Sequence, residues 1–115
     1  MEDKLVIIKK VKILINNLDK ITVNIPRKSY YNGDYIMKYS FEVLENIILC
    51  NYYTNNNIRV NLYNVIMTKL DMLIFILEIY LNYKYISNRY FVNTVNNINQ
   101  IKRMIRVWIY GSKNG

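Results

Sequence analysis

The chain of 115 residues contains no histidine and only one cysteine, Cys50. Histidine is the usual general acid and base near neutral pH, and zinc sites are built from cysteine and histidine clusters, so both kinds of site are excluded. A single cysteine also rules out a disulfide within the chain. Cys50 follows Ile47, Ile48 and Leu49 in an apolar run, and we therefore expect a buried structural thiol there.

Carboxylates are also scarce, with eight Asp and Glu against sixteen Lys and Arg. They are too scattered to form a metal site, although Glu42 and Glu45 are three residues apart and share a helix face. The residues that general acid and base catalysis requires are thus missing or dispersed. We expect no catalytic site, no metal and no cofactor, which disfavours a nuclease or a transferase.

Long uncharged apolar runs are lacking as well. Lysines interrupt the first twelve residues, which do not resemble a signal peptide. The most apolar segment, residues 70–81, contains Asp71 and Glu78 and is shorter than the roughly 20 residues that cross a bilayer. We expect no membrane span and a location in the reducing cytoplasm of a bacterium or archaeon, or of a cell infected by an encoding phage.

The chain has only one proline and three glycines, the residues that most often interrupt helices, and this favours long helices joined by short loops. Apolar residues recur at helical spacing over four ranges, about 4–21, 34–53, 58–84 and 87–110. Asp34 and Ser87 are placed to cap the second and fourth helices, and Pro26 should hold Ile25 extended after the first. The sequence predicts an all-α, antiparallel up-down four-helix bundle that occupies residues 1–115 as one domain.

Apolar residues make up 52% of the chain, more than one small core can hide. The third predicted helix is apolar on more than one side, so both the bundle core and a subunit interface are expected to contact it. The fourth predicted helix has distinct apolar and polar faces. Trp108 lies on the apolar face, and Lys102, Arg103 and Arg106 lie on the polar face. The surplus of apolar side chains indicates self-association.

The charge is distributed unevenly along the chain, whose formal net charge is +8. No acidic residue follows Glu78, whereas six cations do. The positive electrostatic field of such a chain favours a phosphate-rich partner. Arg103 and Arg106 are the strongest candidates for binding phosphate, because a guanidinium group donates two parallel hydrogen bonds from one planar group. The alternative is a basic helix face that is merely solvated. Since no phosphate loop or RNA-recognition motif occurs, binding to RNA or DNA should be largely independent of base sequence.

Several segments resemble the accessory variability determinant (Avd) proteins of diversity-generating retroelements. They are the IPRK segment 25–28, the helix from Met37 to Leu49, the run from Leu70 through Tyr80 followed by Lys84, Ser87 and Tyr90, and the pattern Arg-x-Ile-x-x-Trp-Ile from Arg103 to Ile109. Four-helix proteins encoded within ribosomal RNA intervening sequences share this architecture, and the IPRK segment with the terminal pattern favours Avd.

The resemblance implies a ring-like homopentamer without a catalytic site. It would bind the reverse transcriptase of the element and nucleic acid, and support mutagenic complementary-DNA synthesis. The matching basic positions are Arg27, Lys28, Lys84 and Arg103. Lys69, Lys102 and Arg106 are further candidate binding residues, chosen for their charge and position and not for a match to the family. The alternative is a protein of the intervening-sequence type, or another basic four-helix module that binds nucleic acid or protein.

Overall fold

The computed structural model describes residues 4–27 and 33–111. Its helices are α1 (Lys4–Ile21), α2 (Gly33–Tyr52), α3 (Asn56–Asn82) and α4 (Asn88–Tyr110), with a short 3-10 turn, η1 (Thr22–Asn24), after α1. Within these residues there is no strand, and no helix is both long enough and apolar enough to cross a bilayer. The predicted all-helical fold with four helices is confirmed, and each helix end lies within two residues of its expected position.

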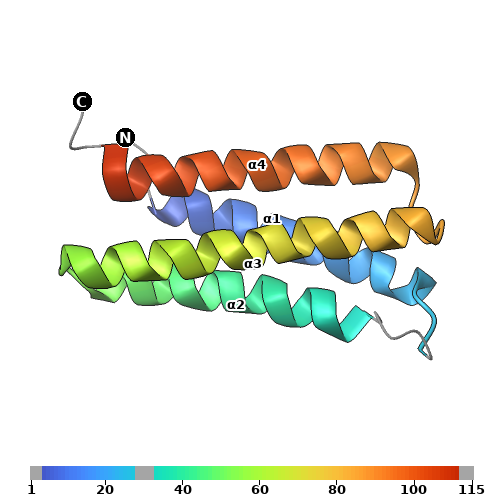
Figure 1. The fold of residues 1–115 in the computed structure, drawn as a ribbon, viewed down its shortest axis with the longest axis horizontal. Coiled ribbons are helices and arrows are strands. Elements are labelled where there is room, and N and C mark those ends of the chain that lie inside the picture. The colour runs from blue at the N-terminus through green and yellow to red at the C-terminus, as the bar shows by residue number, and fades with distance from the viewer. Residues whose placement is uncertain (1–3, 28–32, 112–115) are drawn as a thin grey trace.

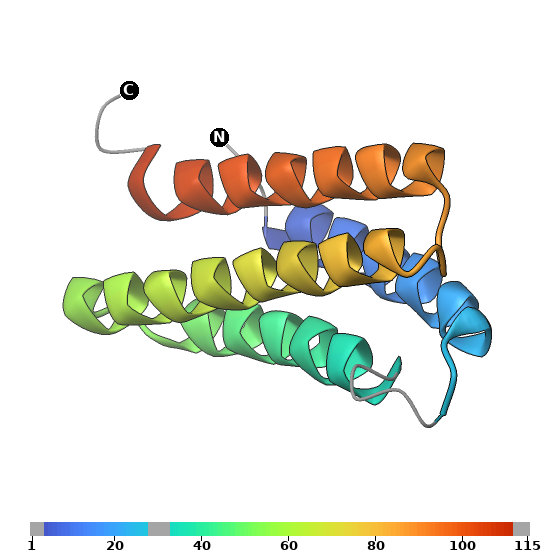
Figure 2. The same cartoon turned by 45° about the vertical axis from the view of Figure 1, so that its right-hand side comes forward.

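Consecutive helices run in opposite directions and lie side by side (Figure 1). Both α1 and α3 contact α2 and α4, whereas the diagonal pairs α1/α3 and α2/α4 make no comparable contact. The helices thus form the four edges of a bundle that is 44 Å long. One end carries the α1–α2 and α3–α4 connections, and the other carries the α2–α3 connection with the start of α1 and the end of α4 (Figure 2).

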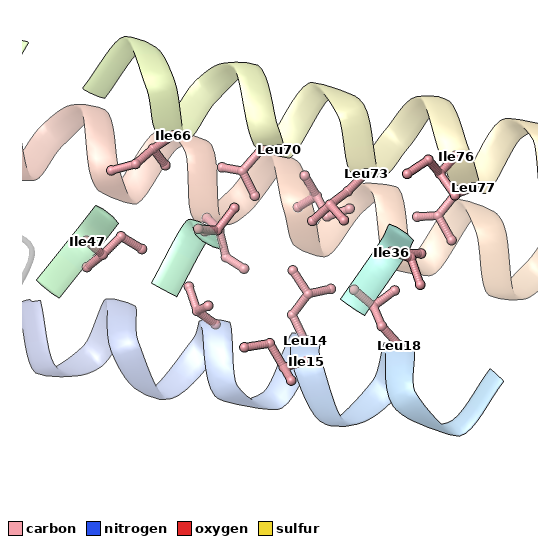
Figure 3. Packing of buried hydrophobic residues seen from close by; sticks show 14 of the residues in the cluster. Leu14, Ile15, Leu18, Ile36, Ile47, Ile66, Leu70, Leu73, Ile76 and Leu77 are labelled. Atoms are coloured by element: carbon pink, nitrogen blue, oxygen red, sulfur yellow. The ribbon is translucent and has the colours of Figure 1, made fainter. Parts of the chain in front are cut away.

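The core is one row of branched apolar side chains between the four helices. The residues with no exposed surface come from every helix and include Val11, Leu18, Ile36, Ile47, Ile66, Leu70, Leu73, Leu77, Ile98 and Ile105. Figure 3 shows side chains from facing helices pointing into this shared space. Full burial of each such side chain contributes about 1.5–3 kcal/mol, so this row supplies most of the stability. Cys50 is buried in the same cluster as a free thiol, as expected.

Trp108 lies at the margin of this core and is only partly buried. The guanidinium carbon of Arg59 stands 5.0 Å from the centre of its ring. Beside this pair, the rings of Tyr63 and Tyr110 meet edge to face at 5.1 Å. These contacts join the first turns of α3 to the last turns of α4.

The connection after α1 follows the prediction in part. Ile25, which precedes proline, is extended with φ −95° and ψ 122°, but residues 22–24 form a 3-10 turn. A Cβ atom on Gly33 would lie 2.8 Å from the Cβ of Thr22, so any larger residue at this position would force η1 and the start of α2 apart. Because α2 already begins at Gly33, Asp34 is not its cap and falls in the first turn, where a carboxylate still favours the helix dipole.

Two other helix starts are capped by side chains. The hydroxyl of Ser87 accepts a hydrogen bond from the N–H of Tyr90 at 3.0 Å, as predicted. At α3, the amide oxygen of Asn55 accepts from the N–H groups of Asn57 and Ile58 at 2.9 and 3.2 Å. This cap starts α3 two residues earlier than apolar spacing alone predicts.

The end of α3 is closed by a pair of backbone hydrogen bonds. The N–H of Tyr85 donates to the carbonyl of Tyr80 at 2.9 Å, and the N–H of Lys84 donates to that of Leu81 at 3.0 Å. This Schellman arrangement requires a left-handed residue, usually glycine, and here Lys84 occupies it with φ 62°. A side chain in that conformation costs on the order of 1 kcal/mol.

A pair of neighbouring substitutions tests the orientation of α4. Ile105 is 0% exposed and Val107 is 40% exposed. We expect Ile105→Ala to lower the free energy of unfolding by about 2–5 kcal/mol because it leaves a cavity, and Val107→Ala to lower it by about 1 kcal/mol or less. Urea denaturation followed by circular dichroism at one protein concentration measures both, and equal losses would contradict this orientation of the helix.

Candidate nucleic-acid interface

Positive charge is concentrated on two neighbouring helices. The α1 helix carries five lysines and one acid, Asp19, and α4 carries four cations and no acid. By contrast, α2 carries one lysine against three carboxylates, and α3 carries two cations against two carboxylates. Since α1 and α4 pack against each other, they form one basic side of the bundle, which we call the basic layer. The α2 and α3 helices form the opposite layer.

A shallow groove runs between the two helices of the basic layer. The residues that line it are Val6, Lys10, Ile13, Leu14, Asn97, Gln100, Ile101, Arg103, Met104 and Val107. Lys10 of α1 and Arg103 of α4 line the same stretch from opposite sides. The lining contains amide donors and cations but no carboxylate, so it suits a negatively charged backbone that lies along the helices.

Two of the predicted residues, Arg103 and Arg106, are exposed on the outer face of α4. Neither forms an ion pair with any carboxylate in the part of the chain that the structure describes. Their guanidinium groups are therefore hydrated and available to a ligand. The two residues come from successive turns of one helix, so their Cα atoms are fixed relative to each other while their side chains can rotate.

Lys69 and Lys102 are also predicted binding residues, and both have partners inside the fold. The Nζ of Lys69 lies 3.0 Å from Oε1 of Glu42 and 5.6 Å from the ring centre of Tyr39, which ties α3 to α2. The Nζ of Lys102 lies 2.6 Å from Oδ1 of Asp71, which ties α4 to α3. Because each charge already has a partner, both lysines attract phosphate less than free cations do.

Arg27 and Lys84 are exposed at the end of the bundle that carries the α1–α2 and α3–α4 connections. Arg103 lies fifteen residues after Asn88, about 22 Å further along the helix axis. The structure therefore separates the predicted residues into the exposed arginines of α4, of which Arg103 lines the groove, the two ion-paired lysines, and this distant end. Lys28 lies outside the described residues.

The contribution of α1 to the groove is not predicted from the sequence, in which its lysines only interrupt an apolar N-terminus. Lys10 lies three residues after buried Ile7 and four before buried Leu14, so it borders the core on one side of α1. That spacing places Lys10 at a helix margin, but it does not show that α4 is the neighbour there.

A second feature is formed by three tyrosines at the end of α3. Tyr80 is 0% exposed, and its ring centre lies 6.0 Å from that of Tyr85. Tyr85 in turn stacks on Tyr83 at 5.6 Å with an angle of 18° between the rings. We call this series the tyrosine ladder. Burial raises the pKa of Tyr80 to about 12, and the nearby charge of Asp34 acts in the same direction.

A search of protein-family models finds none that matches this chain, and no curated protein matches it. Among solved structures, the fold is similar to the crystal structure of a protein of unknown function from the S23 ribosomal protein family of Bacteroides thetaiotaomicron. The TM-score is 0.80 at 13% identity, and the match covers 92% of this chain and 96% of that one. At this identity the likeness shows a shared four-helix fold, and it does not bear on the retroelement family.

The buried hydroxyl of Tyr80 predicts a loss of stability in alkali. The pKa of Tyr80 is about 12 in the folded chain, against 10.0 ordinarily. The stability that its burial in the neutral form contributes is therefore fully present below pH 10 and is lost as pH rises through 12. We expect the Tm of the natural chain to fall more between pH 9.5 and pH 11.5 than that of Tyr80→Phe, which cannot ionise. Calorimetry measures both, and parallel curves would show that Tyr80 ionises as readily in the folded chain as in the unfolded one.

Proposed function

We propose that this protein is a non-catalytic accessory protein of a diversity-generating retroelement. In this role it binds nucleic acid and the reverse transcriptase of the element, and supports mutagenic complementary-DNA synthesis. The observation that carries the nucleic-acid part is the separation of charge between the two layers of the bundle. The retroelement part rests on the IPRK segment and on the terminal pattern from Arg103 to Ile109.

The basic layer supports a phosphate ligand over other anions because its cations are repeated along the helices. Lys10 and Arg103 face one stretch of groove, and Arg106 continues the positive surface toward the end of α4. A chain of phosphates can contact several such groups at once and release counterions from each. Asn97 and Gln100 add hydrogen-bond donors that do not require a particular base.

The opposite layer suits self-association, and we propose the ring-like homopentamer. Its outward faces expose large apolar side chains, among them Phe41, Ile48, Leu49, Val65 and Phe75. Contact between copies through α2 and α3 would bury these groups and keep the basic layers apart, since two such layers repel each other. The basic surface of each copy would then stay open to nucleic acid and to the polymerase.

The second candidate is a four-helix protein of the ribosomal intervening-sequence type. The fold likeness to a member of the S23 ribosomal protein family favours it, and a basic layer suits ribosomal RNA equally well. The gene neighbourhood separates the two. A reverse-transcriptase gene with a variable and template repeat pair supports the first proposal, and a position inside a ribosomal RNA gene supports the second.

Binding should depend on salt and be nearly indifferent to base sequence. Wild-type affinity for an unrelated RNA and an unrelated DNA of equal length should fall together as salt rises. An Arg103→Glu, Arg106→Glu variant should keep its helical circular dichroism and lose binding at least tenfold, because exposed cations contribute little to stability while each phosphate contact contributes to affinity. Fluorescence anisotropy over a salt series measures both effects.

The matched controls are the single variants Arg103→Glu and Lys38→Glu, which change the net charge equally but on different layers. We expect only the first to weaken binding strongly. Equal effects would mean that net charge alone attracts the nucleic acid, and would contradict a binding surface on α4. Unfolding of the double variant would instead identify these arginines as partners within an assembly.

Self-association is tested by light scattering. The natural chain should have the mass of five 13.9-kDa subunits. Phe75→Glu should dissociate the assembly because it places a charge in the apolar contact, whereas Val23→Glu, on exposed η1, should leave the mass unchanged. A strict monomer of the natural chain at micromolar concentration would overturn the pentamer and the role given to the α2–α3 layer.

A further inference from the structure

Lys84 occupies a backbone position that is unfavourable for it. Its φ of 62° lies in the left-handed region, and the two hydrogen bonds that close α3 hold it there. Glycine takes this conformation without a steric penalty, so a lysine at this point lowers stability. Strained residues of this kind concentrate where a side chain has a function in binding. Lys84 is exposed, so its ammonium group extends into solvent and not into the core.

The residues on either side of Lys84 present an aromatic surface. Tyr83 is 60% exposed although its ring stacks on Tyr85. Tyr85 is held in turn by Tyr80, which belongs to the core. The outermost ring is thus supported on one side, and the other side remains accessible to solvent. A ring that is already ordered loses little further entropy when a ligand stacks on it.

We propose that Tyr83 and Lys84 form a stacking site for an unpaired base of single-stranded RNA or DNA. The base extends the tyrosine ladder on the open side of Tyr83, and Lys84 contacts the adjacent phosphate. This inference rests on the proposed nucleic-acid function and adds its substrate class. The site is separate from the basic groove, because the α3–α4 turn and Arg103 lie about 22 Å apart along the bundle.

Single-stranded nucleic acid is favoured because the bases of a duplex already stack on one another and leave no free face for Tyr83. Aromatic stacking tolerates every base, which agrees with the absence of any base-reading motif. Arg27 and Arg89 are also exposed at this end and add positive charge around Lys84. Asp34 is the opposing acid, and its charge acts on Tyr80 at the inner end of the ladder.

The test uses the full chain with a labelled oligouridine of roughly 12 nucleotides and an RNA hairpin with the same number of phosphates. Fluorescence anisotropy gives the affinities, and calorimetry gives the Tm. Tyr83→Leu should weaken oligouridine binding about tenfold and leave hairpin binding nearly unchanged. Tyr83→Trp, which keeps an aromatic ring, should bind oligouridine as the natural chain does. Tyr52→Leu, the same change at the other end of the bundle, should not alter binding.

Lys84→Gly provides a readout that a purely structural role cannot imitate. We expect its Tm to rise, since glycine relieves the left-handed strain, while oligouridine binding weakens. If the natural chain binds neither probe, both the proposed function and this inference fail. If it binds both probes, and Tyr83→Leu and Lys84→Gly bind like the natural chain or weaken both probes equally, the stacking site is overturned and the basic-layer proposal stands.

Discussion

Burial of branched apolar side chains along one row determines where every other group in this bundle can lie. Each helix turns one face toward that row, and the contacts of α1 and α3 with both α2 and α4 leave each helix one outward face. The outward faces of α1 and α4 carry most of the cations, whereas those of α2 and α3 carry more of the exposed large apolar groups. The order in which the helices pack therefore brings the two most cationic helices together on one side of the bundle.

Ion pairs then divide the cations into two kinds. Lys102 and Arg103 are adjacent in the chain, but about 100° apart around α4. Lys102 faces α3, where Asp71 pairs with it, and Arg103 lines the groove beside α1. Lys69 resembles Lys102, since Glu42 of α2 pairs with it. Two adjacent residues of α4 thus have different roles: Lys102 joins two helices, and Arg103 is free to bind a ligand.

The fold alone does not choose between a retroelement role and a ribosomal one. A four-helix bundle with this topology is shared with an S23-family protein whose function is unknown, and one architecture can host many functions. The surface of this chain carries two features that the fold does not dictate: a basic layer without carboxylates in its groove, and a lysine held in a strained turn between two stacked tyrosines. Both features suit a ligand with phosphates and unpaired bases.

The sequence by itself determined the helices, their polar and apolar faces, and the Ser87 cap, because these depend on neighbours three or four residues away. It also indicated the cationic character of α4. Only the tertiary structure decided which cations are free, since Lys69 and Glu42 are 27 residues apart and Lys102 and Asp71 are 31 apart. The groove of Lys10 with Arg103 and the strained φ of Lys84 likewise depend on packing between helices and on turn geometry, which no local periodicity encodes.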